Sequence, residues 1–241
     1  QKRAISEARR AQRRSICLPT DLVQAFTIAK SKAMNAWVQA KNEDNYSLFA
    51  PHLQEIVDLT RQKAQCYDSS NNLYDNLLDG YDPGLTTDKL KPMFARLKAA
   101  LVPLVAEVTS RQQGTPLQSH YSIEELNRIN LHIIESLGFN LQAGRLDESA
   151  HPFTIGLDPS DVRLTTRNNP SKLLNTIGGT IHECGHGLYE QGLPTQWKKL
   201  GLCRASGAGI HESQSRFYEN IIGRSLSFFE WLQPTLHQIS P

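Results

Sequence analysis

Two histidines and a glutamate form the most informative cluster of the sequence, within GGTIHECGHGLYE at residues 178–190. On a helix, residues four apart lie on the same face, so His182 and His186 can direct two imidazole nitrogens at one metal ion. Glu183 projects near that ion without having to bind it. Zinc hydrolases use such a set, because the metal lowers the pKa of a bound water and a carboxylate removes its proton. The motif therefore predicts a catalytic metal site with Glu183 as the general base.

A catalytic zinc site usually has a third protein ligand, and the segment AGIHESQSRFYEN offers two candidates. Glu212 and His211 follow the histidine pair after a loop that contains Gly192 and Gly201. Because neighbouring helix residues diverge by about 100°, only one of the two can face the ion. We expect Glu212 to be the ligand, since two histidines and a glutamate are a known catalytic zinc set. His211 is the competing candidate.

The elements that must position these residues are predicted to be mainly helical. Apolar residues recur at steps of three and four in several segments: 22–37, 53–57, 90–101, 126–137 and 173–188. Ser122 and Glu125 have the spacing of a capping box, and Gly138 can end the helix that they begin. The stretch between 138 and 170 is rich in turn-forming residues, and its VRLTT portion alternates like a strand. We expect loops there, with a short strand or hairpin near residues 160–167.

The composition argues against several other classes of protein. With 39% hydrophobic and 21% charged residues and a net charge of +2, the chain is predicted to be globular, without a global preference for nucleic acid. The basic stretch QKRAISEARRAQRR is interpreted as a solvated helix face, with a nucleic-acid or membrane contact as the alternative. No signal peptide or membrane span is visible, and the four cysteines lack paired spacing. We therefore expect a cytoplasmic protein without nucleic-acid or membrane partners.

Four motifs in order carry a resemblance to a known family: HPF at 151–153, DVRLT at 161–165, HECGH at 182–186 and HESQ at 211–214. They resemble the H-P-F, D-x-R-x-T, H-E-x-x-H and H-E-S-Q motifs of the thermostable metallocarboxypeptidases typified by carboxypeptidase Taq. The similarity continues through LTTDKLKPMFARLKAAL and SQSRFYENIIGRS, so it covers most of the chain.

This resemblance implies a mainly helical, groove-forming, zincin-like metallopeptidase that removes single residues from peptide C-termini. It also implies one zinc or cobalt ion per chain and a homodimer. By position, His182, His186 and Glu212 resemble the family's metal ligands, and Glu183 resembles its general base.

The same resemblance suggests residues that bind substrate or orient the metal ligands: His151, Asp161, Arg163 and His211. The first two motifs would line the groove near the metal. Asp161 and Arg163 have an alternative role, which is a simple structural ion pair with each other. We expect residues 1–137 to form one groove wall and residues 138–241 to form the metal-site segment, within one continuous domain.

The sequence lacks two motifs that follow these in the family, [IV]-R-x-x-A-D and G-x-x-Q-D-x-H-W, and family chains are longer. We therefore expect a truncated chain without its C-terminal half. A carboxypeptidase is the leading hypothesis, and a helical oligoendopeptidase or a non-catalytic metal- or peptide-binding fragment are the alternatives. An exopeptidase usually holds the terminal carboxylate with arginine, but the spacing singles out no arginine for that role.

Overall fold

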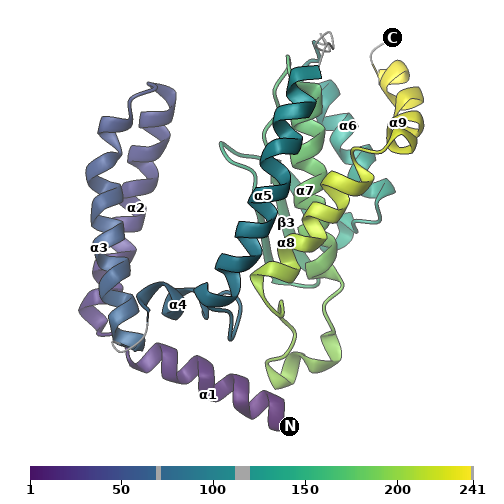
Figure 1. Ribbon diagram of the computed structural model, residues 1–241. Helices are drawn as coiled ribbons and strands as arrows, with labels where there is room; N and C mark the ends of the chain where they lie inside the picture. Colours follow the sequence, from purple (N-terminus) through teal and green to yellow (C-terminus); the bar gives the residue numbers. More distant parts are fainter. Residues whose placement is uncertain (69–71, 112–119, 240–241) are drawn as a thin grey trace. The chain divides into compact units, whose positions relative to one another are not determined.

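The computed structural model describes residues 1–68, 72–111 and 120–239, and the chain divides into two compact units, Gln1–Ser110 and Arg111–Pro241 (Figure 1). Both units are mainly helical, as predicted, and the second also contains a small sheet. No helix within these described ranges is long and apolar enough to cross a membrane.

The first unit is built from helices: α1 (Lys2–Ile16), α2 (Thr20–Asn42), η1 (Tyr46–Leu48), α3 (Ala50–Tyr67), α4 (Leu73–Leu78) and α5 (Thr87–Arg111). Helices α2 and α3 pack side by side, joined by the short turn at η1 (Figure 1). The buried residues of this pair are all alanines: Ala29, Ala33, Ala40 and Ala64. Their small side chains let two helices approach closely, so this pair is thin and has little apolar core.

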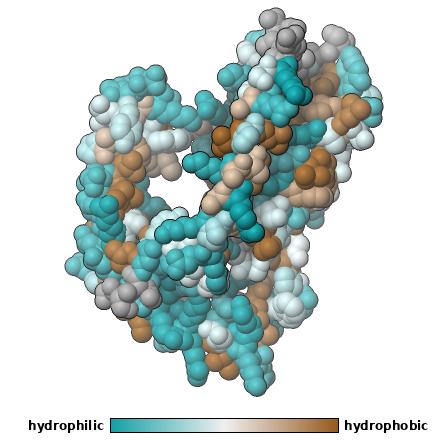
Figure 2. Space-filling view, viewed as in Figure 1, coloured by the Kyte–Doolittle hydropathy of each residue, from teal (hydrophilic) through white to brown (hydrophobic). Residues whose placement is uncertain are grey.

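Helix α5 has no buried residue, although much of it is apolar. Phe94, Leu97, Leu101 and Val105 are each about half exposed. Figure 2 shows apolar side chains at the surface along this helix. Contiguous apolar surface is characteristic of a contact site rather than of a solvated helix.

The second unit contains the remaining elements: α6 (Ile123–Ser136), η2 (Leu141–Ala143), β1 (Gly144–Glu148), β2 (Thr154–Asp158), β3 (Asp161–Thr166), α7 (Leu173–Gln191), η3 (Thr195–Leu200), α8 (Ala208–Arg216), the π-helical turn η4 (Phe217–Ile222) and α9 (Leu226–Ile239). The capping box predicted for α6 is confirmed. The Ser122 hydroxyl accepts from the Glu125 N–H at 3.1 Å, and the Glu125 carboxylate accepts from the Ser122 N–H at 2.7 Å. Gly138 follows this helix with φ of +97°, a conformation that favours glycine.

The sheet has three strands in the order β1-β3-β2. The strand predicted near residues 160–167 is confirmed as β3, and β2 forms the antiparallel hairpin with it. Strand β1, which was not predicted separately, pairs parallel with β3 on its other side, so β3 is the central strand. Val162 and Leu164 of β3 are fully buried, which fixes the sheet against the following helix.

Helix α7 is the centre of the second unit. One apolar cluster joins it to α6 and α9: Leu126, Ile129, Ile133, Leu173, Ile177, Ile181, Phe228 and Leu232. A second cluster, which includes Cys184, Val162 and Leu164, joins it to the sheet. Helix α6 thus packs within this unit, whereas the expected boundary at residue 137 places it with the preceding helices. The two clusters hold α7 from both sides and leave one face for chemistry. The groove-wall roles predicted for residues 1–137 and 138–241 stay predictions.

Candidate metal centre

The HECGH segment lies in the second half of α7, and Gly185 within it allows α8 to approach. A Cβ added to Gly185 would lie 2.6 Å from the Ser215 Cα, a distance that side-chain rotation cannot relieve. Any other residue would therefore push the two helices apart. This close approach brings the first turns of α8, with Glu212, to the histidine-bearing face of α7.

The structure brings the three predicted metal ligands together. Glu212 Oε2 lies 3.2 Å from His186 Nε2 and 3.7 Å from His182 Nε2. All three ligand atoms lie within 4.8 Å of one another. Ligand atoms about 2.0 Å from a tetrahedral zinc are roughly 3.3 Å apart, so the cluster is close to the size of such a site. Two imidazoles and a carboxylate are also a donor set that suits zinc, and the residues therefore fit the ion that the motif predicts.

The electrostatics of the cluster favour the ligand forms of these groups. Burial, together with the neighbouring His211 and His182 rings, lowers the pKa of His186 to about 4, so its imidazole is neutral at pH 7. Burial opposes ionisation of Glu212, but the hydrogen bond from Arg216 and the nearby imidazoles outweigh it and lower the pKa. A neutral imidazole and an ionised carboxylate are what a divalent cation binds.

Glu219 orients one of the histidines. Its Oε2 lies 2.9 Å from His182 Nδ1, on the side of the ring opposite to the ligand cluster. Arg216 and Arg224 each donate to the same carboxylate at 3.0 Å. Burial alone would raise the pKa of Glu219, but the hydrogen bonds from His182 and Arg224 lower it. A carboxylate on the outer imidazole nitrogen fixes the tautomer that presents Nε2 to a metal. By contrast, the buried Nδ1 of His186 has no hydrogen-bond partner among the described residues.

The predicted general base, Glu183, is 6% exposed and lies between α7 and the sheet. Thr154 of β2 donates its hydroxyl proton to Glu183 Oε2 at 2.7 Å. Burial raises the pKa of Glu183, and the Thr154 hydrogen bond and the His182 charge oppose that effect. The hydrogen bond from Thr154 therefore holds the carboxyl group in one orientation. The pKa is raised, which is the direction expected of a general base.

His211 does not join the ligand cluster. Its Nε2 lies 2.7 Å from Glu190 Oε1, and its ring stacks on His186 with centroids 4.4 Å apart. Tyr189 also contacts the His211 ring edge-on, at 4.9 Å between centroids. His211 is therefore packed against a ligand and faces Glu190, whereas the adjacent Glu212 faces the cluster.

The remaining predicted residues lie outside the ligand cluster. Asp161 and Arg163 form a bidentate pair with each other, with both hydrogen bonds at 3.0 Å, and both side chains are about half exposed. None of their hydrogen bonds in the described chain reaches a predicted ligand, which agrees with the ion-pair alternative. The exposed His151 lies near enough to Glu183 for its charge to lower that residue's pKa.

Sequence reasoning missed three supporting residues. Thr154, Glu190 and Glu219 hold Glu183, His211 and His182, respectively, by hydrogen bonds. Glu219 follows the predicted ligand Glu212 by two helical turns, so its spacing was a usable signal. Thr154 and Glu190 had no such signal, because their positions depend on how the sheet packs against α7.

Comparisons with known proteins agree with this geometry. A sequence model of the family described as carboxypeptidase Taq (M32) metallopeptidase matches residues 1–241. Carboxypeptidase 1 of Bacillus subtilis is 35% identical over 243 residues, which cover 100% of this chain and 48% of the relative. Thermostable carboxypeptidase 1 of Thermus thermophilus is 38% identical over 247 residues, which cover 98% of this chain and 48% of the relative.

A solved structure of Pyrococcus furiosus carboxypeptidase shares the fold with a TM-score of 0.84 and 38% identity, covering 96% of this chain and 48% of that one. The chain spans about half the length of the relatives that it matches. The match over the full sequence and the shared fold show that the chain belongs to the carboxypeptidase Taq family of metallopeptidases.

Proposed function

We propose that this chain carries the catalytic metal centre of a metal-dependent carboxypeptidase, which removes single residues from peptide C-termini. One observation carries the proposal: the ligand atoms of His182, His186 and Glu212 lie within 4.8 Å of one another, and the neighbouring Glu183 is buried and held by a hydrogen bond from Thr154. Relatives named carboxypeptidases support peptides as the substrate class.

Each residue of the site has a defined task in this proposal. His182, His186 and Glu212 would hold one zinc or cobalt ion per chain, which supplies polarisation of the scissile carbonyl and acidification of water. Glu183 accepts the proton of the attacking water and can return it to the leaving amine. Thr154 donates to Oε2 of Glu183, which leaves Oε1 with both lone pairs available for that proton.

The assembly and location of the protein are part of the same proposal. A homodimer rests on the family resemblance alone. A cytoplasmic location agrees with the four cysteines, Cys17, Cys66, Cys184 and Cys203, which are all free thiols.

Two alternatives, a non-catalytic binding fragment and an endopeptidase, are compatible with the hydrogen bonds of two arginines near the site. Arg216 is bound to Glu212 and Glu219, and Arg224 is bound to Glu219, so neither is free to hold a substrate carboxylate. A binding fragment without catalysis, or an endopeptidase that needs no free carboxylate, is compatible with that observation.

A matched pair of substrates separates these functions. The purified chain, loaded with zinc, is incubated with a peptide that has a free C-terminus and with the same peptide as its C-terminal amide. The proposal predicts release of the last residue from the free acid only, and loss of that release in Glu183→Gln at unchanged zinc content. Internal cleavage of both peptides would identify an endopeptidase. Stoichiometric peptide binding without any cleavage would identify a binding fragment.

A further inference from the structure

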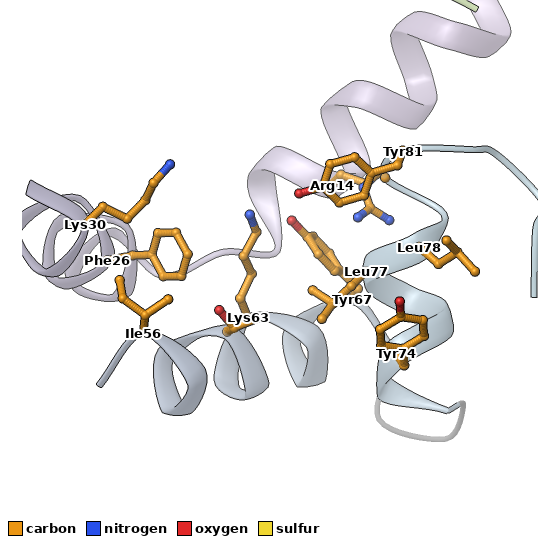
Figure 3. Close-up of a pocket in the computed structure, with 12 residues that line it drawn as sticks. Arg14, Phe26, Lys30, Ile56, Lys63, Tyr67, Tyr74, Leu77, Leu78 and Tyr81 are labelled. Carbon is orange, nitrogen blue, oxygen red and sulfur yellow. The ribbon is translucent and has the colours of Figure 1, made fainter. Parts of the chain in front are cut away.

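The first unit contains a cavity of about 600 Å³, and the described residues that line it all lie between 14 and 81, outside the metal centre. It lies between the α2–α3 pair and the segment around α4 (Figure 3). Ile56, Leu77 and Leu78 supply apolar surface, and Phe26 and Tyr67 supply ring faces. A cavity of this volume with mixed apolar and polar walls has the size of a small-molecule or side-chain binding pocket.

Among the described residues that line this cavity, the charged ones are all cationic: Arg14, Lys30 and Lys63. Arg14 is already engaged, since it donates to Asp79 at 3.2 Å and to the Asn76 carbonyl at 3.1 Å. Its guanidinium also lies 3.9 Å from the centre of the Tyr67 ring. Arg14 is therefore a fixed part of the wall, and the two lysines carry the charge that remains available.

Lys30 and Lys63 approach the same ring from two helices. The Lys63 Nζ lies 5.3 Å from the centroid of Phe26, and the Lys30 Nζ lies 5.9 Å from it. Neither ammonium group has an acidic partner within the described ranges 1–68, 72–111 and 120–239. Two like charges beside one ring repel each other, and an anion placed between them would remove that repulsion.

The hydroxyl groups of Tyr67 and Tyr81 extend the polar side of the pocket. In Figure 3 both hydroxyls and the Lys63 ammonium point toward the same space. Hydroxyl donors beside two ammonium groups can satisfy the oxygens of a carboxylate or a phosphate. Cationic and hydroxyl groups beside an apolar surface therefore favour a ligand that is both anionic and partly apolar.

We propose that this cavity binds an anionic ligand with an aromatic or apolar body. The anionic group lies between Lys30 and Lys63, and the body packs on Phe26 and the aliphatic floor. A ligand with this chemistry has two possible sources. One is a free small molecule, and the other is an acidic peptide segment that contains an aromatic residue.

Titration calorimetry on the whole 241-residue chain tests the proposal with probes for both sources. Phenyl phosphate is compared with benzyl alcohol, which keeps the ring but not the charge, and with inorganic phosphate, which keeps the charge but not the ring. The peptide acetyl-Asp-Phe-Asp-amide is compared with acetyl-Asn-Phe-Asn-amide. Both peptides are blocked at both ends, so they offer no free C-terminus to a carboxypeptidase.

The decisive variant is Lys30→Gln/Lys63→Gln, and Lys32→Gln/Lys98→Gln is its control. The control also removes two positive charges from exposed lysines of the first unit, but neither residue lines the cavity. We expect saturable binding of at least one anionic probe, at least tenfold weaker in the first variant and changed less than twofold in the control. Added salt should weaken that binding. The stronger of the two anionic probes identifies the source of the ligand.

Three results would overturn the proposal. The first is the absence of saturable binding by both anionic probes, which is what two solvated lysines lying across a ring would give. The second is equal binding of an anionic probe and its neutral counterpart. The third is binding that survives Lys30→Gln/Lys63→Gln unchanged, which would locate the anion elsewhere, for example on a bound metal. Circular dichroism of both variants checks that each remains folded.

Discussion

Glu219→Gln should weaken zinc binding without removing a ligand. The Glu219 Oε2 bonds His182 Nδ1 at 2.9 Å and also accepts from Arg216, while Oε1 accepts from Arg224. Glutamine has only one acceptor oxygen. Its NH₂ group must therefore replace one of the two carboxylate oxygens, and it then faces either Arg224 or the pair formed by His182 and Arg216. The substitution therefore removes the charge that fixes the His182 tautomer and places two donors against each other.

The expected loss follows from that geometry. Replacing an outer partner of a ligating histidine costs about 10- to 100-fold in metal affinity, which corresponds to about 1.4 to 2.7 kcal/mol. The side chain of Glu219 is only 14% exposed, so water cannot fully replace the lost carboxylate, and we expect the upper half of that range.

Zinc affinity is measured by competition with a chromophoric chelator at fixed pH and salt. Glu230→Gln is the control, because it removes the same charge from an exposed position on α9. Equal zinc affinity of wild type and Glu219→Gln, within twofold, would refute the assignment of Glu219 as the residue that positions His182. A loss of the same size in the control would attribute the effect to net charge instead.

Further predictions concern the third metal ligand, the contact between α7 and α8, and the carboxylate of Asp158. Glu212→Ala should lose most zinc affinity in the same competition assay, whereas His211→Ala should retain it, and the opposite order would make His211 the ligand. Gly185→Ala should destabilise the fold by about 1–3 kcal/mol in urea unfolding because the new methyl group would overlap α8, whereas Gly178→Ala, whose Cβ meets no atom within 4 Å, should not. The hydrogen bond from Lys198 lowers the pKa of Asp158 from 3.8 to about 2. The ionised Asp158 therefore stabilises the fold above pH 3.8, and this contribution is lost as the pH falls toward 2. A carboxyl titration by NMR with a midpoint near 3.8 would contradict that pairing.

Local patterns predicted the elements of this fold, because each depends on a few neighbouring residues. The capping box at Ser122 and the left-handed turn at Gly138 are set by hydrogen bonds and sterics within a few residues. Strand β3 alternates visibly because its Val162 and Leu164 face the core while Arg163 faces outward. The parallel partner β1 was missed because its register depends on contacts that are distant in the sequence, and its exposed pattern does not alternate strongly.

The same distinction between local patterns and contacts distant in the sequence applies to the metal centre. The proximity of His182 and His186 follows from one helix, so spacing alone predicts it. The choice of Glu212 over His211 followed from the chemistry of zinc. In the structure Glu212 lies with the two histidines, on a helix whose close approach Gly185 allows.

What the motif does not encode is the support of each functional side chain. The partner of Glu183 comes from a strand that precedes it by 29 residues, and the partner of His182 comes from a π-helical turn 37 residues later. A π-helical turn offsets the residues beyond it from the α-helical spacing, so a pattern based on that spacing locates Glu219 only approximately. The ligand set is thus a local property of two helices, whereas the orientation of its histidine and of its base depends on the packing of the whole second unit. Substitutions in that packing should therefore alter metal affinity and base orientation even when every motif residue is intact.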